Sequence, residues 1–257
     1  MFEKKIVAIG GGQIFVPCQP PTTLVIDQEI VRLADERSLH HPPRVLFVPT
    51  ASGDDMLYCH GMYNVYSARL GCEFDHLRIL AERLSDRQIE NKINWADIIY
   101  VGGGNTLKMM NAWRRRRVDR LLITAYEQGK VMCGLSAGAM CWFDWGLSDS
   151  RKFANPKSWK PIRVKGLGLL PYGCCPHHDS EGWRRLSFEK VVKRSYGVGV
   201  TIEDNCALAV VGDCFRFISS QPRKSGSLLR WIPPHNLARH PFSHGQEDWR
   251  TFKEVLC

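Results

Sequence analysis

The chain has 257 residues, of which 44% are hydrophobic, and a formal net charge of +9 at pH 7. This composition and length are typical of a globular protein with a sizeable core. No apolar run approaches the roughly 20 residues that a membrane helix needs, and the run Ile6–Ile9 is too short for a signal peptide. We therefore expect a cytoplasmic protein without a membrane-spanning segment.

The positive charge and the cysteines carry little functional information. The densest basic run, Arg114–Arg117, lies inside a helical pattern without a nucleic-acid-binding motif. We interpret it as a solvated helix face and expect no nucleic-acid partner, although a positive field could attract anionic substrates. The ten cysteines include no C-x-x-C pair, so we expect reduced thiols, no metal site and no cofactor.

Apolar runs alternate with helical patterns over the first part of the chain. Strands are predicted at Lys5–Ile9, Val45–Pro49, His76–Leu80, Ala96–Val101 and in the run from Val131 that ends at Ser136. Helices are predicted at Thr22–Ala34, Met56–Leu70, Arg87–Ile93 and Thr106–Tyr126. Continuous apolar strands that alternate with helices predict an α/β fold, with a mostly parallel central sheet covered by helices on both faces.

The pattern weakens in the second part of the chain. Ser150–Lys165 is polar and contains two prolines, which predicts a long loop. A helix is expected at Trp183–Val192, followed by short strands at 198–202, 207–211 and 215–218 that form a small C-terminal hairpin or meander. From about Gln221 the sequence predicts a polar, Pro-rich tail with a last helix at Asp248–Leu256. Without repeats or a linker, residues 1–257 are expected to form a single domain.

The most informative stretch is Gly134-Leu135-Ser136-Ala137-Gly138, which follows an apolar run and precedes small helix-forming residues. It matches G-x-S-x-G, in which a strand-to-helix turn lifts a serine hydroxyl to the end of a sheet. The glycines permit an unusual turn and a close approach of helix and strand. The first helical N–H groups lie where an anionic intermediate would form. An ordinary turn that happens to contain these residues is the alternative.

A second turn, Val101-Gly102-Gly103-Gly104-Asn105-Thr106, also ends a strand and begins a helix. Because ligands of a parallel sheet bind at the carboxyl ends of its strands, both turns can face one crevice. The glycine N–H groups could supply one oxyanion donor and the Ala137 N–H the other. No lysine follows at P-loop spacing, which argues against a phosphate loop. The ordinary alternative is a glycine turn in which Asn105 or Thr106 caps the helix.

A serine nucleophile needs a base, and the base needs an orienting acid. His177 follows Pro176 at the end of an apolar stretch, so it could reach the sheet edge that carries Ser136. The nearest acids in the sequence are Asp144, Asp149 and Asp179. Asp149 lies in the loop that leaves the Ser136 helix and is well placed to return to the crevice.

The motifs at 101–106, 134–139 and Pro176-His177, with the spacing between the first two, resemble the peptidase E and cyanophycinase family of serine peptidases over about residues 5–218. The resemblance implies a flavodoxin-like, class I glutamine amidotransferase-like fold with a serine nucleophile. The residues that it assigns are the nucleophile Ser136, the base His177, the acid Asp149 with Glu203 as a second candidate, and the oxyanion donors Gly104 and Ala137.

In peptidase E, the resemblance implies, the substrate is like a dipeptide with an N-terminal Asp whose carboxylate is bound by an Arg after the catalytic His. Arg184 and Arg185 occupy about that place in this chain. Because they lie about 100° apart on a helix, we expect one of them to face the site. Asn105 is the other candidate for substrate binding. The loop at 148–150 and the insert after it depart from peptidase E, so we expect a peptidase-E-like relative.

The sequence therefore predicts a metal-independent serine peptidase that hydrolyses small peptides, possible substrates being dipeptides with an acidic N-terminal residue. It leaves a homodimer open. One alternative is an α/β-hydrolase-type esterase, in which Asp213 would act with His240 or His244. The other is a non-catalytic binding module that kept the fold and lost the reaction.

Overall fold

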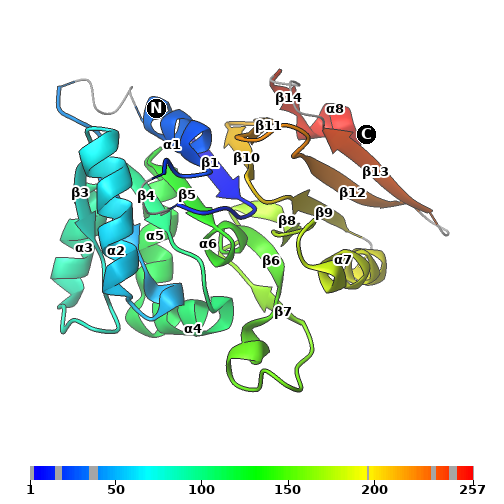
Figure 1. Ribbon diagram of the computed structural model, residues 1–257, viewed down its shortest axis with the longest axis horizontal. Helices are drawn as coiled ribbons and strands as arrows, with labels where there is room; N and C mark the ends of the chain where they lie inside the picture. The colour runs from blue at the N-terminus through cyan, green and yellow to red at the C-terminus, as the bar shows by residue number, and fades with distance from the viewer. Residues whose placement is uncertain are drawn as a thin grey trace.

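The computed structural model describes residues 3–14, 19–34, 40–195, 197–232, 236–242 and 248–256. Within these residues the strands form an eight-stranded and a six-stranded sheet, flanked by helices (Figure 1). His244, one of the histidines of the esterase alternative, lies outside the described residues. No helix in the described ranges combines the length and the apolar character needed to cross a bilayer.

The first sheet has the strand order β14-β11-β10-β1-β5-β4-β2-β3. Its strands are β1 (Lys5–Ile9), β2 (Arg44–Val48), β3 (Glu73–His76), β4 (Ile98–Val101), β5 (Val131–Leu135), β10 (Cys206–Val211), β11 (Cys214–Ser219) and β14 (Arg250–Thr251). The strands from β1 to β3 in this order run parallel, whereas β10, β11 and β14 extend the sheet antiparallel. Every residue of β1 and β5 is buried, as expected for strands covered on both faces. The predicted α/β fold is confirmed.

Helices cover both faces of this sheet. The α-helices of the described chain, of which α1 to α5 cover this sheet, are α1 (Leu24–Arg32), α2 (Met56–Tyr63), α3 (Asp86–Trp95), α4 (Thr106–Arg116), α5 (Val118–Glu127), α6 (Ala137–Met140), α7 (Gly182–Ser195) and α8 (Phe252–Leu256). One face of the sheet packs against α1 and α2 through residues such as Ile26 and Met62. The other face packs against α3, α4 and α5 through residues such as Ile89 and Leu122. Both faces are therefore removed from water, which stabilises the fold through the hydrophobic effect.

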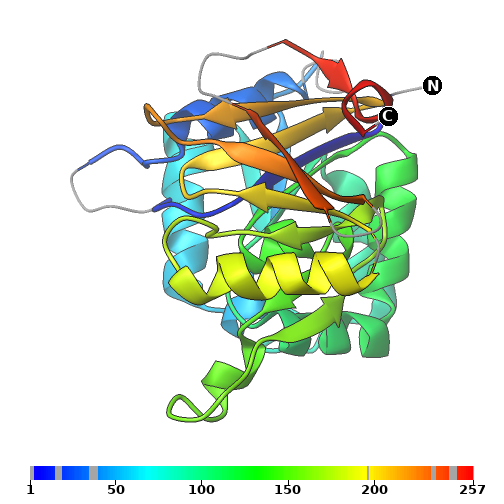
Figure 2. The ribbon, with the colours of Figure 1, turned by 90° about the vertical axis from the view of Figure 1, so that its right-hand side faces the viewer.

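The second sheet was not predicted as a separate sheet. It has the order β13-β12-β9-β8-β6-β7. Of the three strands expected to form a C-terminal hairpin or meander, 207–211 and 215–218 pair antiparallel in the first sheet as β10 and β11, whereas 198–202 lies in the second sheet. Its strands are β6 (Phe143–Ser148), β7 (Ile162–Lys165), β8 (Leu170–Cys175), β9 (Val198–Ile202), β12 (Gly226–Ile232) and β13 (Asn236–Phe242). One face joins the core under the first sheet, and α7 covers the outer face (Figure 2). Two of its strands, β12 and β13, lie in the segment expected to be a polar tail, because polar and partly exposed residues interrupt their apolar runs.

The structure divides the helix predicted over Thr106–Tyr126 into α4 and α5. Arg117, between them, has a φ of 57°, and its N–H still donates to the carbonyl of Trp113. Trp113 is fully buried and donates its indole N–H to Thr50 Oγ1 at 3.2 Å. Because the chain changes direction at Arg117, α4 and α5 both pack against one core. This packing fixes the position of α4, which begins directly after the glycine turn.

Burial of Asp27 in α1 makes stability depend on pH. Its carboxylate accepts hydrogen bonds from Thr23 Oγ1 at 2.8 Å and Tyr66 OH at 2.9 Å. Burial outweighs these bonds and raises the pKa of Asp27 from 3.8 to about 6. The pKa of Asp27 is therefore higher in the folded protein than in the unfolded chain, so the folded state favours the neutral carboxyl. The stability that this preference contributes to the fold is fully present below the unfolded pKa, and it is lost as pH rises through the folded pKa.

We predict that wild type loses on the order of 3 kcal/mol of unfolding free energy relative to Asp27→Asn between about pH 4 and pH 7. The amide in the variant stays neutral, so its own stability lacks this component. Denaturant unfolding of both proteins across that range measures the difference. Profiles that run parallel would contradict the assignment of the pKa shift to Asp27.

Candidate active site

Ser136 lies at the predicted strand-to-helix turn, between β5 and α6. Its backbone has a φ of 58°, a left-handed conformation that is rare for residues other than glycine. A Cβ on Gly138 would lie 2.0 Å from the carbonyl oxygen of Val101, and one on Gly134 would lie 2.6 Å from the carbonyl oxygen of Gly138. The two glycines are therefore needed because the turn packs directly against the end of β4.

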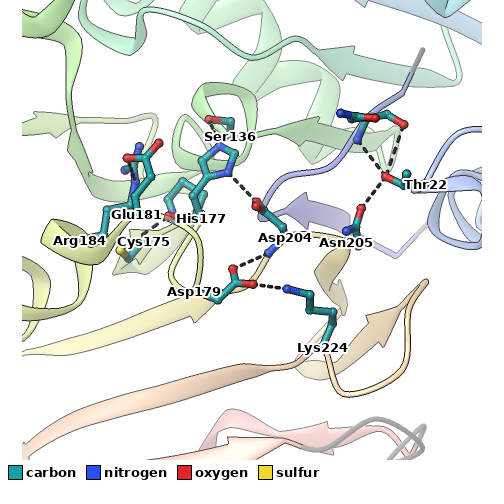
Figure 3. A network of polar contacts seen from close by, with 12 residues as sticks. Thr22, Ser136, Cys175, His177, Asp179, Glu181, Arg184, Asp204, Asn205 and Lys224 are labelled. Atoms are coloured by element: carbon teal, nitrogen blue, oxygen red, sulfur yellow. Dashed lines mark hydrogen bonds and ion pairs between the residues drawn. The ribbon is translucent and has the colours of Figure 1, made fainter. Parts of the chain in front are cut away.

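A hydrogen-bonded chain of three side chains passes through Ser136 (Figure 3). His177 Nε2 lies 2.8 Å from Ser136 Oγ, and His177 Nδ1 lies 2.6 Å from Asp204 Oδ1. His177 follows β8 and Asp204 follows β9, which are parallel neighbours in the second sheet. Ser136 follows β5 of the first sheet, so the site is assembled where the two sheets meet.

The end of β1 holds all three segments together. The carbonyl oxygen of Ile9 accepts the N–H of Ser136 at 3.0 Å, and that of Gly10 accepts the N–H of His177 at 3.1 Å. The carbonyl oxygen of Gly11 accepts the N–H of Asn205, the residue after Asp204, at 2.9 Å. Three consecutive carbonyl groups thus fix the backbone at the nucleophile, the imidazole and the carboxylate.

The two predicted acids contact residues other than His177 in this geometry. Asp149 Oδ1 lies 3.9 Å from Arg184 Nη2, and Glu203 Oε2 accepts the N–H of Ser225 at 2.9 Å. Glu203 and Asp204 are consecutive where β9 ends, but their carboxylates contact different residues, Ser225 and His177. Asp149 does reach the edge that carries His177, because β6 is parallel to β8, but it lies on the side facing α7.

The environment of Asp204 favours the charged carboxylate. Burial raises its pKa, but hydrogen bonds from His177 and Ser180 and the nearby charges of His177 and Lys224 outweigh burial and lower the pKa below its ordinary 3.8. An ionised carboxylate at Nδ1 favours the imidazole tautomer with a proton on Nδ1. Nε2 is then free to accept the hydroxyl proton of Ser136.

The predicted oxyanion donors lie in the turns after β4 and β5, and a Cβ on Gly103, the residue before Gly104, would lie 3.5 Å from Ser136 Cβ. The N–H groups on either side of Gly104 are engaged: that of Gly103 donates to Tyr58 OH at 3.4 Å and that of Asn105 donates to the carbonyl oxygen of Ala51 at 2.8 Å. Within the described residues, the N–H groups of Gly104 and Ala137 form no hydrogen bond. Both N–H groups are therefore free to donate to a ligand.

The residues predicted to bind substrate are occupied by contacts within the protein. Asn105 Oδ1 caps α4 by accepting the N–H of Lys108 at 3.0 Å, which is the ordinary alternative. The side chain of Arg184 is buried, with Nε 2.8 Å from Glu181 Oε2. Arg185 is exposed and lies 3.7 Å from Glu189 Oε1. These contacts disfavour the predicted role of either arginine in binding a substrate carboxylate.

The geometry also disfavours the esterase alternative. Asp213 follows β10, whose residue Val211 pairs with Lys5 at the start of β1. Ser136 lies at the other end of β1, beside Ile9. Asp213 is therefore separated from Ser136 by the length of the strand.

The sequence analysis did not single out Asp204 as the partner of His177, nor the space that the glycines after β1 leave for this contact. A Cβ on Gly11 would lie 1.9 Å from Asp204 Oδ1 and 2.5 Å from His177 Nδ1. Gly11 therefore leaves the space in which the carboxylate and the imidazole meet. The signal was present as a glycine run after the first strand, at the edge where ligands of a parallel sheet bind.

Metal ligation is not indicated in the part of the chain that the structure describes. No group of three or more His, Cys, Asp or Glu side chains there could hold a metal ion. The eight described cysteines are free, and seven of them are buried.

The sequence profile of peptidase family S51 matches residues 6–218. The chain is 34% identical over 220 residues to the uncharacterized peptidase YgaJ of Bacillus subtilis (strain 168), covering 85% of this chain and 88% of that protein. It is 29% identical over 134 residues to peptidase E of Shewanella denitrificans, covering 49% and 55% of the two chains. The crystal structure of a peptidase from an acI-B1 actinobacterium shares the fold, with a TM-score of 0.73 over 97% of both chains at 17% identity.

The chain therefore belongs to peptidase family S51. The predicted family is confirmed, and so is the prediction of a serine-type peptidase, a hydrolase whose substrate is a peptide.

We predict that Gly11→Ala lowers the rate of peptide hydrolysis by at least about 100-fold per folded molecule. The added methyl group displaces Asp204 or His177, and a misplacement of about 1 Å can cost that much. Gly182→Ala is the matched control, because its Cβ would meet no atom within 4 Å. A Gly11→Ala protein as active as the Gly182→Ala protein would contradict this role.

Proposed function

We propose that this peptidase cleaves small peptides through a catalytic triad of Ser136, His177 and Asp204. The observation that carries the proposal is the pair of short contacts at His177, 2.8 Å to Ser136 Oγ and 2.6 Å to Asp204 Oδ1. Nucleophile, base and orienting acid are thus in the order and reach that acyl transfer requires. The N–H groups of Gly104 and Ala137 are the proposed donors to the oxyanion.

In the proposed reaction, Ser136 Oγ attacks the scissile carbonyl while His177 Nε2 takes the hydroxyl proton. The N–H groups of Gly104 and Ala137 donate to the oxyanion of the tetrahedral intermediate. Collapse breaks the C–N bond, and Nε2 returns the proton to the leaving amine. Water then attacks the acyl-enzyme with the same base, which releases the acid product and restores Ser136. Asp204 remains ionised and stabilises the imidazolium throughout.

The charge of the insert after β6 supports peptides with an acidic residue, including dipeptides with an acidic N-terminus, as the substrate class. From Ser150 to Lys165 the chain has six basic residues and no acidic one. The insert leaves the edge that carries His177, because β6 and β8 run parallel. It projects from the body of the molecule (Figures 1 and 2).

The insert is anchored beside the proposed oxyanion donors and borders a hollow of its own. The N–H of Leu107, in the first turn of α4, donates to Ser150 Oγ at 3.0 Å. Arg151, Lys157 and Lys160 help to line a hollow of about 660 Å³. Within the described residues, none of these three side chains forms an ion pair. Their charges are therefore available to attract an anionic peptide.

We predict that Ser136→Ala and Asp204→Asn each lower peptide hydrolysis by at least about 10³-fold. The first removes the nucleophile, and the second favours the wrong imidazole tautomer. Asp149→Asn, the control, keeps the rate within about threefold because Asp149 does not contact His177. Steady-state kinetics on a panel of dipeptides and tripeptides tests all three. An unchanged rate in Ser136→Ala would refute the triad, and a large loss in Asp149→Asn alone would restore the sequence-based acid.

We predict that Lys157→Glu combined with Lys160→Glu raises KM for an Asp-containing peptide on the order of tenfold at low salt, with little change for a neutral peptide. Reversing the two charges repels an anionic substrate and leaves the triad in place. Arg83→Glu combined with Arg87→Glu changes the net charge equally, at exposed positions near the start of α3. Equal effects of the two double variants, or no preference of wild type for the acidic peptide, would contradict the acidic-substrate proposal.

A further inference from the structure

An ion pair lies directly behind the carboxylate that contacts His177 (Figure 3). Lys224 Nζ is hydrogen-bonded to Asp179 Oδ2. The other oxygen of this carboxylate, Asp179 Oδ1, accepts the backbone N–H of Asp204 at 2.9 Å. Lys224 and Asp204 are therefore linked through Asp179 by two hydrogen bonds, and neither bond belongs to the proposed triad.

The ion pair joins three loops that are far apart in the sequence. Asp179 lies two residues after His177, on the loop between β8 and α7, and Lys224 lies between β11 and β12. The residue after each partner adds a contact: Ser180 hydrogen-bonds the carboxylate of Asp204, and Ser225 accepts the N–H of Glu203 at 3.1 Å. The loop carrying the acid is held between the loop carrying the base and the connection from β11 to β12.

Lys224 is a cation among several acidic side chains. Together with its hydrogen bond to Asp179, the charges of Asp179, Glu203 and Asp204 all raise its pKa, so the three carboxylates lie within electrostatic range of its ammonium group. Like charges at short range disfavour each other, and a nearby cation offsets this repulsion. The hydrogen bond from Lys224 to Asp179 raises the pKa of Lys224. The lysine is therefore charged at neutral pH and can neutralise Asp179.

We propose that Asp179 and Lys224 are positioning residues that fix the acid of the triad. Asp179 holds the peptide from which the Asp204 carboxylate projects, and Lys224 keeps Asp179 in place and balances its charge. This inference rests on the proposed triad of Ser136, His177 and Asp204. It assigns a catalytic consequence to a lysine outside the triad, in a segment for which the sequence predicted a polar tail.

The first test is Lys224→Met, assayed by steady-state hydrolysis and thermal unfolding. We expect kcat to fall about tenfold, the lower end of the range for a partner that orients a functional group. KM should stay within about twofold because Lys224 does not face the serine, and the unfolding temperature should be unchanged because half-exposed ion pairs contribute little to stability. Lys224→Arg, which can keep the pair, should retain most of kcat.

Arg223→Met is the matched control. It removes one positive charge from the same turn, and Arg223 forms no ion pair within the described residues. If Lys224 acts through its contact with Asp179, Arg223→Met should have the wild-type kcat. An equal fall in both variants would mean that only the long-range field matters, and it would overturn the proposal.

A double-mutant cycle tests whether the two residues act together. Asp179→Asn keeps an oxygen for the N–H of Asp204 but loses the attraction of Lys224. If the pair acts as one unit, the combined variant Asp179→Asn, Lys224→Met is no slower than the slower single variant. Multiplicative losses would overturn this coupling.

The activity of Ser136→Ala distinguishes a failure of the proposed triad from a failure of the proposed positioning role. Activity that persists in Ser136→Ala contradicts the proposed triad itself. Activity that is lost in Ser136→Ala and kept at the wild-type kcat in Lys224→Met leaves the triad standing and overturns the positioning role.

Discussion

The site depends on three consecutive carbonyl groups where β1 ends. The carbonyl oxygens of residues 9–11 accept the N–H groups of Ser136, His177 and Asn205. These acceptors have fixed spacing, because they belong to one short stretch of backbone in the middle of the first sheet. Segments from two sheets are thereby brought to one place, which neither sheet could achieve through its own strand pairing.

The backbone segments that meet at the end of β1 lie so close together that Gly11 and Gly138 have no room for a side chain. Two of the residues there also have strained backbone conformations. Ser136 and His177 both have positive φ, at 58° and 52°, and such conformations cost on the order of 1–3 kcal/mol each when surrounding structure holds them. The hydrogen bonds to the end of β1 and the tight packing around Gly11 and Gly138 supply that restraint. As a result, the side chains of Ser136 and His177, which are 41 residues apart in the sequence, lie at hydrogen-bond distance.

The sequence was sufficient for those features that follow from apolar runs and turn chemistry. Buried strands and G-x-S-x-G predicted the parallel sheet and the exposed turn at Ser136, and the rule that parallel strands end at one edge placed His177 near it. The contact of Asp204 with His177 was not predicted because Glu203 and Asp204 are adjacent, and the partner that each carboxylate reaches depends on how the chain turns after β9. The outer strands of the second sheet were missed because their half-exposed faces do not give a continuous apolar pattern.

In the proposed triad, Asp204 makes Ser136 reactive through His177. The rate at which a fluorophosphonate modifies the folded protein tests it without knowledge of the substrate, with the adduct located by peptide mass spectrometry. We expect an adduct on Ser136 in wild type and labelling at least about 100-fold slower in Asp204→Asn. An adduct at another residue, or equal labelling rates in the two proteins, would contradict it.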